Sequence, residues 1–297
     1  MTTDNQRQPR DDESTSLGSL GHPHLSIAAS ADGTSIGYQS LGSGPDAILV
    51  GGALSCGADY LPLARLLGES LRIHVMDRRG RGASGAQGPA YDIERECQDL
   101  LAVQRQTGAR AVFGHSYGGL VALETARRTD SFERLAVYEP GVSVAGSMPV
   151  GWLGECRRRL DSDDPRGAFA VMARGAGHAP AFLTRAPFGF VRALMHTMPR
   201  GQWRHLEALL PTALAENDQI AQLDAPDASR FASISAPVLL LGGTKSPEAI
   251  TLPALRALHD ALPDSQLRLV EGLEHTAPTR RAPKALAERL TAFLSSP

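Results

Sequence analysis

Residues 111–120 read Ala111-Val112-Phe113-Gly114-His115-Ser116-Tyr117-Gly118-Gly119-Leu120, an apolar run that leads directly into a glycine-flanked serine. The run predicts a buried strand, and the residues after the serine predict a helix. A serine on such a turn has strained backbone angles, and its neighbours two positions away must be small for the turn to close. Gly114 and Gly118 meet this requirement, and the flanking strand and helix distinguish the pattern from a chance match in a chain with 30 glycines. The sequence therefore predicts an exposed, reactive hydroxyl at Ser116.

Apolar runs alternate with amphipathic stretches on both sides of this turn. Near-continuous apolar runs are typical of parallel strands that are buried on both faces, and the stretches between them have helical spacing. A hairpin with the turn Asp32-Gly33 precedes them. We therefore predict an α/β fold, a doubly wound, mostly parallel, eight-stranded sheet with helices on both faces. The predicted strands are 24–29, 34–40, 47–50, 72–76, 111–114, 135–138, 238–241 and 267–270, and the predicted helices are 58–69, 93–106, 118–128, 252–261 and 284–293.

The interval 142–233 breaks the alternation, because it has no good strand but several helical segments separated by Pro and Gly. We interpret it as a helical cap inserted into a core formed by residues 24–141 and 234–297. Its apolar residues could pack among its own helices or face a cleft over the sheet: Trp152, Phe169, Met172, Phe182, Phe188, Phe190, Met195, Met198 and Trp203. Residues 1–23 are polar, so we expect a disordered tail rather than a signal or membrane anchor.

Composition narrows the class of partner. The 30 basic and 32 acidic residues nearly cancel, so no strong field favours nucleic acid or an anionic membrane, and we expect a small-molecule substrate. An apolar run long enough to span a bilayer, about 18 residues, does not occur. The three cysteines, Cys56, Cys97 and Cys156, are an odd number without metal-ligand spacing, which favours a reducing cytoplasm.

A serine hydroxyl is a weak acid, so an imidazole must take its proton and later deliver it to the leaving group. Nine histidines compete for this role. His275 follows the last predicted strand and precedes the last helix, which is the position and chain order that this kind of turn requires. His115 would point away from the neighbouring Ser116, so we assign it to packing and hydrogen bonding. The others lie in the tail, within a strand or in helical segments: His22, His24, His74, His178, His196, His205 and His259.

A catalytic serine and imidazole need a third partner, a carboxylate that holds the imidazole in the correct tautomer and stabilises its cation. The tip after strand 238–241 carries no acid, and Glu248 follows only a few residues later. Glu139 ends the preceding strand, 135–138, and lies at the same edge of the predicted sheet. We therefore predict Glu139 as the acid and keep Glu248 as the runner-up. The alternative is that Glu139 is merely solvated or anchors the cap.

Two backbone N–H groups are the predicted oxyanion donors. Tyr117 opens the helix after the serine, so its N–H points at a developing negative charge. A second donor is expected in the loop Val50-Gly51-Gly52-Ala53-Leu54, where we predict the N–H of Ala53. The alternative for this loop is a plain glycine turn after a strand.

Together these residues resemble the α/β-hydrolase superfamily from about His24 onward. The segment Asp77-Arg78-Arg79-Gly80-Arg81-Gly82-Ala83-Ser84-Gly85 is similar to a turn found after the fourth strand in many small-molecule hydrolases of this superfamily, where it shapes the loop beneath the site. The resemblance implies structural roles for Asp77 and its arginines. An acid after the sixth strand resembles a minority arrangement seen in some haloalkane dehalogenases and fungal mycotoxin lactonases. The dehalogenases have Asp at the elbow, whereas this chain has Ser116.

We expect Ser116 to attack an ester, lactone or related acyl carbonyl and form an acyl-enzyme that water releases. The same triad supports carbon-carbon bond hydrolysis, perhydrolysis and lyase chemistry, and the motifs exclude none of them. A catalytically degenerate ligand-binding or biosynthetic accessory protein is a third hypothesis, favoured by the missing acid after strand 238–241. No metal site, phosphate-binding loop or dinucleotide motif occurs in a persuasive context, so we predict no cofactor and no metal. The sequence carries no signal of the oligomeric state.

Overall fold

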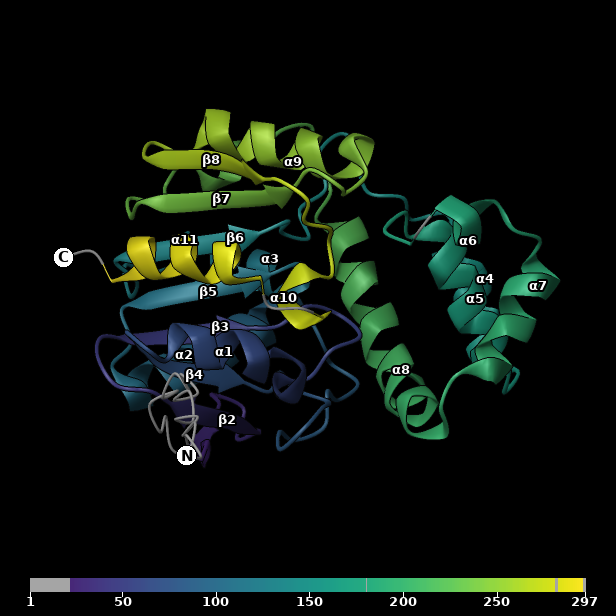
Figure 1. Cartoon of the computed structure of the whole chain (residues 1–297), viewed down its shortest axis with the longest axis horizontal. Coiled ribbons are helices and arrows are strands. Elements are labelled where there is room, and N and C mark those ends of the chain that lie inside the picture. The colour runs from purple at the N-terminus through teal and green to yellow at the C-terminus, as the bar shows by residue number, and fades with distance from the viewer. Residues whose placement is uncertain (1–21, 180, 281–282, 296–297) are drawn as a thin grey trace, which may run out of the picture.

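Eight strands form one sheet at the centre of the protein, and Figure 1 shows helices in front of it and behind it. The computed structural model describes residues 22–179, 181–280 and 283–295, so the predicted tail at 1–23 lies outside the described residues except for its last two. The strand order is β1-β2-β4-β3-β5-β6-β7-β8. β2 runs antiparallel to β1 and β4, and all other neighbours are parallel. The strands are β1 (His24–Ala29), β2 (Ser35–Leu41), β3 (Asp46–Val50), β4 (Arg72–Met76), β5 (Ala111–His115), β6 (Arg134–Tyr138), β7 (Val238–Gly243) and β8 (Ser265–Val270).

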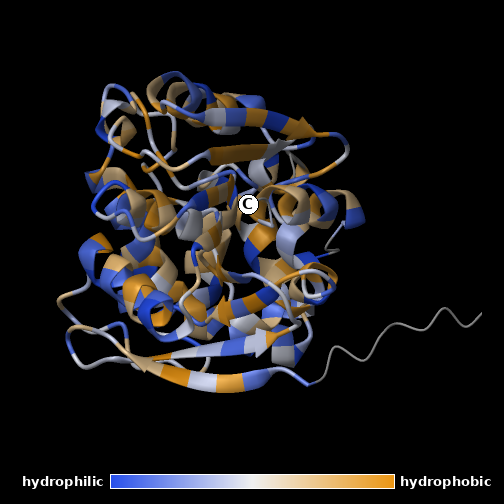
Figure 2. Ribbon diagram, turned by 90° about the vertical axis from the view of Figure 1, so that its left-hand side faces the viewer, coloured by the Kyte–Doolittle hydropathy of each residue, from blue (hydrophilic) through white to orange (hydrophobic). Residues whose placement is uncertain are grey.

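Helices cover both faces of the sheet, as the fold prediction requires. α1 (Leu61–Leu67) and α11 (Lys284–Leu294) pack on one face, and α2 (Ile93–Thr107), α3 (Tyr117–Ala126) and α9 (Glu248–Ala261) pack on the other. The central strands are buried except for the first residues of β3 and β6, which explains their near-continuous apolar sequences. The edge strands β1 and β8 are largely exposed, and Figure 2 shows that they mix hydrophilic and hydrophobic residues. Between them, these layers confirm the predicted doubly wound α/β sheet.

The predicted elements differ from the observed ones mainly at helix starts. Predicted and observed strands agree to within two residues at every end. The helix predicted at 252–261 begins earlier, at Glu248, and includes Pro253 in its interior, where one backbone hydrogen bond is lost. The helix predicted at 58–69 is a 3-10 turn, η1 (Gly57–Tyr60), followed by α1 with Pro62 in its first turn.

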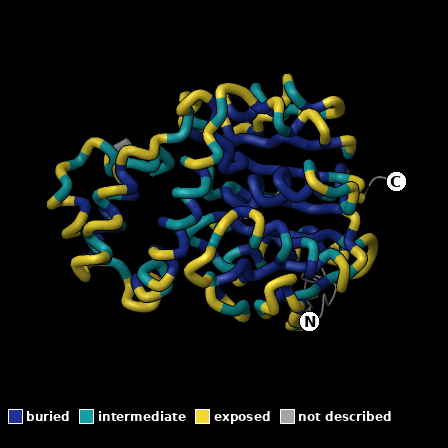
Figure 3. Tube along the Cα trace, turned by 180° about the vertical axis from the view of Figure 1, so that it is seen from behind, coloured by how far each residue is buried: buried dark blue, intermediate teal, exposed yellow. Residues whose placement is uncertain are grey.

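The interval between β6 and β7 is helical, and no named strand falls among its described residues. It contains α4 (Leu153–Asp161), α5 (Pro165–Gly175), α6 (Ala181–Arg185), α7 (Phe188–Leu194), η2 (Met195–Thr197), α8 (Arg200–Gln222) and η3 (Ser229–Phe231). These helices lie beside the edge toward which the parallel strands point, with α8 next to the sheet (Figure 1). Figure 3 shows much more exposed chain here than in the sheet.

Most of the aromatic and apolar side chains of this helical segment pack against one another. Trp152, Met172, Met195 and Trp203 are buried in its small core, whereas Phe182 and Phe190 are exposed. The core also takes in Ala53 and Leu54 from the loop after β3, so the segment packs on that loop. Among the helices that the structure describes, none combines the length and apolar character needed to cross a lipid bilayer.

Candidate active site

Ser116 lies on the sharp turn between β5 and α3, and its backbone is strained. Its φ of 53° and ψ of −121° are angles that non-glycine residues rarely adopt. The turn closes only because its flanking positions lack side chains. A Cβ added to Gly118 would lie 2.2 Å from the carbonyl oxygen of Val50, and one added to Gly114 would lie 2.5 Å from the carbonyl oxygen of Gly118. The Ser116 carbonyl also accepts a 2.7 Å hydrogen bond from the N–H of Gly141, which fixes the turn to the chain after β6.

The structure brings Ser116, His275 and Glu139 together from three separate loops. The distance from Ser116 Oγ to His275 Nε2 is 3.2 Å, and the distance from His275 Nδ1 to Glu139 Oε2 is 2.7 Å. The second contact assigns the proton on Nδ1, since the carboxylate can only accept. Nε2 is then free to accept the proton of the serine hydroxyl. A serine, an imidazole and a carboxylate that are hydrogen-bonded in this order can perform nucleophilic catalysis.

Glu139 is buried and held by two hydrogen bonds, whereas Glu248 is exposed. The second oxygen of Glu139, Oε1, accepts the N–H of Gly243 at 2.8 Å. The backbone of Glu139 has a φ of 44°, which turns its side chain across the sheet edge toward His275. Glu248 lies at the start of α9 with an exposed side chain, and no hydrogen bond with His275 is found for it among the described residues. The geometry favours Glu139 as the partner of the imidazole.

The start of α3 and the loop after β3, which carry the two predicted oxyanion donors, lie beside Ser116. Tyr117 is the first residue of α3, so its N–H belongs to the positive end of that helix. Gly52 lies against the serine, because a Cβ added to it would be 2.9 Å from the Cβ of Ser116. Ala53 follows directly and is partly buried against the helical segment. The loop after β3 and the start of α3 therefore enclose the serine from two sides.

His115 connects the loop after β3, through Tyr60, to the backbone of His275. Its Nε2 donates to the carbonyl oxygen of His275 at 2.9 Å, so its Nδ1 accepts the hydroxyl proton of Tyr60 at 2.7 Å. Tyr60, in η1, in turn accepts the N–H of Gly52 at 2.8 Å. Burial, with the nearby His275 as the second cause, lowers the pKa of His115 well below its usual value. His115 thus stays neutral and positions other groups, as expected for a residue of packing and hydrogen bonding.

Arg78 anchors the loop after β3. Its guanidinium donates to the carbonyl oxygens of Gly51 at 2.8 Å and Gly52 at 3.0 Å. It also pairs at 2.8 Å with Glu96 of α2 and with Glu216 of α8, and all three side chains are buried. Burial opposes the charge of Arg78, but the two carboxylates raise its pKa well above its usual value. The network therefore joins the loop after β3 to both α2 and α8.

The neighbours of Arg78 make structural contacts as well. Asp77 accepts the N–H groups of Gly57 at 2.7 Å and Ala83 at 2.9 Å. Arg79 donates twice to Asp99, at 2.6 and 2.7 Å. These contacts hold loops together beneath the site, in agreement with the structural role that the resemblance implied.

His178, from the loop between α5 and α6, covers the imidazole of His275. The two ring centroids are 4.0 Å apart with an interplanar angle of 33°. Burial, with the nearby His275 as the second cause, lowers the pKa of His178 to about 3. The same loop packs on α9, because a Cβ added to Gly177 would lie 2.1 Å from Ile250. No role was predicted for His178, since nothing in its local sequence distinguishes it.

The space beside Ser116 is small in this conformation. Its volume is about 10 Å³, which is on the order of one water molecule. Apart from the triad, it is lined by Pro140, Gly141, Met148, His178, Ile250, Thr251 and Ala254. Met148, His178 and Ile250 are the large side chains of this lining outside the triad.

Comparisons of sequence identify the family. The model of the alpha/beta hydrolase family matches residues 47–289. A pimeloyl-acyl-carrier-protein methyl ester esterase from Vibrio atlanticus is 36% identical over 116 residues, which are 38% of this chain and 43% of that protein. The corresponding esterase from Chromobacterium violaceum is 35% identical over 100 residues, which are 33% and 38% of the two chains. The chain thus spans less than half the length of these curated relatives.

Comparisons of structure cover nearly the whole chain. An alpha/beta hydrolase from Sphaerobacter thermophilus has a TM-score of 0.76 and 32% identity, over 90% of this chain and 99% of that chain. An esterase from Rhodococcus sp. has a TM-score of 0.65 and 22% identity, over 92% and 98%, which shows the shared fold alone. With the family model matched over most of the chain and the site geometry described above, this protein belongs to the alpha/beta hydrolase family.

Proposed function

We propose that the protein hydrolyses an ester, lactone or related acyl bond of a small molecule through a Ser116-His275-Glu139 triad. The observation that carries this proposal is the continuous hydrogen-bonded line from Ser116 Oγ through His275 to the buried carboxylate of Glu139. The methyl ester esterase from Vibrio atlanticus, by its name, cleaves an ester, and its similarity to this chain supports the same class of bond.

The mechanism follows from which groups can hold a proton. Ser116 Oγ attacks the carbonyl carbon while its proton passes to His275 Nε2, and the new imidazolium is stabilised by Glu139. The N–H groups of Ala53 and Tyr117 donate to the oxyanion. Nε2 then gives its proton to the departing alcohol as the bond to the leaving group breaks. Water, activated by the same imidazole, attacks the acyl-enzyme and releases the acid and free Ser116.

We further propose that residues 142–233 act as a cap that admits and shapes the substrate. Its His178 and Met148 narrow the space beside Ser116, and its α8 is joined by Glu216 to the anchor of the loop after β3. The lining offers mostly apolar contacts and a few polar groups, which is typical of sites for small organic acyl groups.

Turnover of p-nitrophenyl acetate and butyrate tests the proposal, with Ser116→Ala as the matched variant. We expect Ser116→Ala to lose at least about three decades in kcat, since the residual rate comes only from binding and the oxyanion donors. A fluorophosphonate probe should label the wild type at Ser116 and leave the variant unlabelled. Equal turnover by both proteins would overturn the proposed nucleophile.

A panel of lactones, thioesters and alkyl esters then defines the acyl bond. Ester or lactone hydrolysis that depends on Ser116 supports the proposal. If the protein reacts with the fluorophosphonate but turns over none of these substrates, the proposed hydrolysis must be replaced by another reaction of the same triad.

A further inference from the structure

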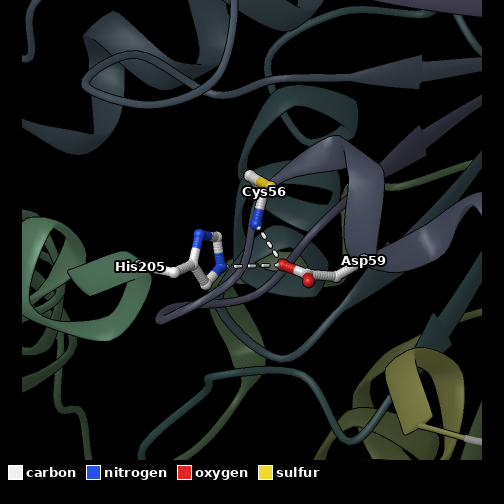
Figure 4. A group of neighbouring side chains, drawn as sticks. All are labelled: Cys56, Asp59 and His205. Atoms are coloured by element: carbon white, nitrogen blue, oxygen red, sulfur yellow. Dashed lines mark hydrogen bonds and ion pairs between the residues drawn. The ribbon is translucent and has the colours of Figure 1, made fainter. Parts of the chain in front are cut away.

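Cys56, Asp59 and His205 gather on the boundary between η1 and α8 (Figure 4). Cys56 and Asp59 belong to the start of η1, and His205 belongs to the first half of α8. One ligand atom from each, the thiol sulfur, a carboxylate oxygen and an imidazole nitrogen, lies within 4.8 Å of the other two. Among the described residues, this is the one group of three such side chains close enough to share a metal ion.

We propose that Cys56, Asp59 and His205 form a binding site for a divalent transition metal of the zinc class. Sulfur, imidazole nitrogen and carboxylate oxygen are the three ligand types that Zn²⁺ takes in proteins. At metal–ligand distances of about 2.1 Å, two tetrahedral N and O ligands are about 3.4 Å apart. Asp59 Oδ2 and His205 Nε2 are 3.3 Å apart, a spacing that is long for a charge-assisted hydrogen bond and matches a tetrahedral edge.

The position of the cysteine is also compatible with a tetrahedral site. With a metal–sulfur distance of about 2.3 Å, the sulfur belongs about 3.6 Å from the other two ligands. The separation of at most 4.8 Å therefore leaves a gap on the order of 1 Å. Cys56 is half-buried and forms no disulfide, and its sulfur accepts the backbone N–H of Asp59, so a rotation of its side chain that gives up this contact would close the gap. The N–H of Cys56 donates to Asp59 Oδ2 at 2.8 Å and holds that oxygen in place from outside the site.

Binding of a metal ion at this site needs no further reactant. The S–H bond of Cys56 breaks, a metal–sulfur bond forms, and the proton passes to the solvent. Neutral His205 and ionised Asp59 each donate a lone pair, and a water molecule fills the fourth position. The bound ion would connect α8 to η1, whose Tyr60 accepts the N–H of Gly52 in the loop after β3. A metal at this point would therefore hold the helical segment against the loop that flanks Ser116.

Titration with Zn²⁺ alone tests the proposal on full-length, tag-free protein that has been treated with a chelator. Isothermal calorimetry should give one zinc per chain. Cys56→Ser and His205→Gln should each weaken the affinity by at least about tenfold. With Co²⁺ as the probe, the wild type should show a thiolate-to-cobalt absorption band in the near ultraviolet, and Cys56→Ser should lack it.

Two matched controls separate this site from other histidines. His196→Gln removes an exposed imidazole of the same helical segment and should leave the zinc affinity unchanged. His178→Gln removes the imidazole stacked on His275 and should also leave it unchanged. Binding lost in His178→Gln but kept in His205→Gln would assign the zinc to the triad region and overturn the proposal.

The metal-site proposal would also be overturned if the wild-type protein did not bind zinc stoichiometrically at micromolar concentrations. This measurement depends on no variant. Circular dichroism and thermal unfolding without zinc should be the same for all variants, because Cys56 and His205 are partly exposed. The experiment measures metal affinity, so a failure of the metal-site proposal would not affect the proposed ester hydrolysis.

Discussion

Replacing Glu139 by Gln removes one charge and keeps the shape of the side chain. In the native site, Oε1 accepts the N–H of Gly243 at 2.8 Å and Oε2 accepts His275 Nδ1–H at 2.7 Å. A Gln amide has only one oxygen, so it cannot accept both hydrogen bonds. If the oxygen stays on Gly243, the NH₂ group faces Nδ1 and forces the proton of His275 onto Nε2, where it blocks proton transfer from Ser116.

The opposite orientation of the Gln amide is also costly. The oxygen then accepts Nδ1–H, but the NH₂ group faces the N–H of Gly243, and the buried unsatisfied donor costs about 1–3 kcal/mol. In either orientation the imidazolium loses its anionic partner. We therefore expect kcat to fall by about three to four decades, or about 4–5.5 kcal/mol of transition-state stabilisation.

The assay is p-nitrophenyl ester hydrolysis at saturating substrate, with Glu248→Gln as the matched control. Glu248 is exposed at the start of α9, so its variant should stay within about twofold of the wild type. Circular dichroism and thermal unfolding establish that both variants are folded. A folded Glu139→Gln that keeps more than a tenth of the wild-type kcat, or a large loss in Glu248→Gln instead, would refute the reasoning.

Three further predictions concern the surroundings of the triad. His178 is neutral when folded because burial lowers its pKa to about 3, so the unfolded chain gains a proton first as the pH falls through about 6.5. The wild type should therefore lose about 2 kcal/mol more stability than His178→Gln between pH 7.5 and pH 5, measured by urea unfolding, and parallel pH curves would contradict this. Glu216→Ala leaves the buried Arg81 without its carboxylate partner and removes one of the two carboxylates that pair with Arg78, so it should cost about 3–5 kcal/mol, while Glu207→Ala, half-exposed on the same helix, should cost little by the same measurement. Gly118→Ala would push a methyl group to within 2.2 Å of the Val50 carbonyl, so we expect misfolded protein or loss of esterase activity, and a fully active, stable variant would count against the elbow packing.

Much of the fold could be predicted because its signals are local. Each central strand is buried on both faces, so its sequence is continuously apolar, and each covering helix carries its own amphipathic spacing. The hydroxyl at Ser116 was predictable for the same reason, since its strained turn needs small residues at fixed offsets. The order of elements along the chain then indicated His275 and Glu139 at the same sheet edge.

The groups that surround these residues could not be predicted, because long-range packing alone brings them together. Arg78 and Glu216 are 138 positions apart, and Asp59 and His205 are 146 positions apart. No local pattern selects a stacked His178 or a bridging Tyr60, since the chain has nine histidines and five tyrosines and neither of these two residues lies in a distinctive motif.

The chain by itself determined the alternation of strands and helices and the strained turn at Ser116, because backbone geometry and burial act on neighbouring residues. Only the tertiary structure decided which carboxylate meets the imidazole, how closely His178 covers it, and which buried charges anchor the loop after β3. Those choices depend on distances across the sheet edge and between the sheet and α8. Such distances are set by the packing of whole elements and leave no mark at any single position in the sequence.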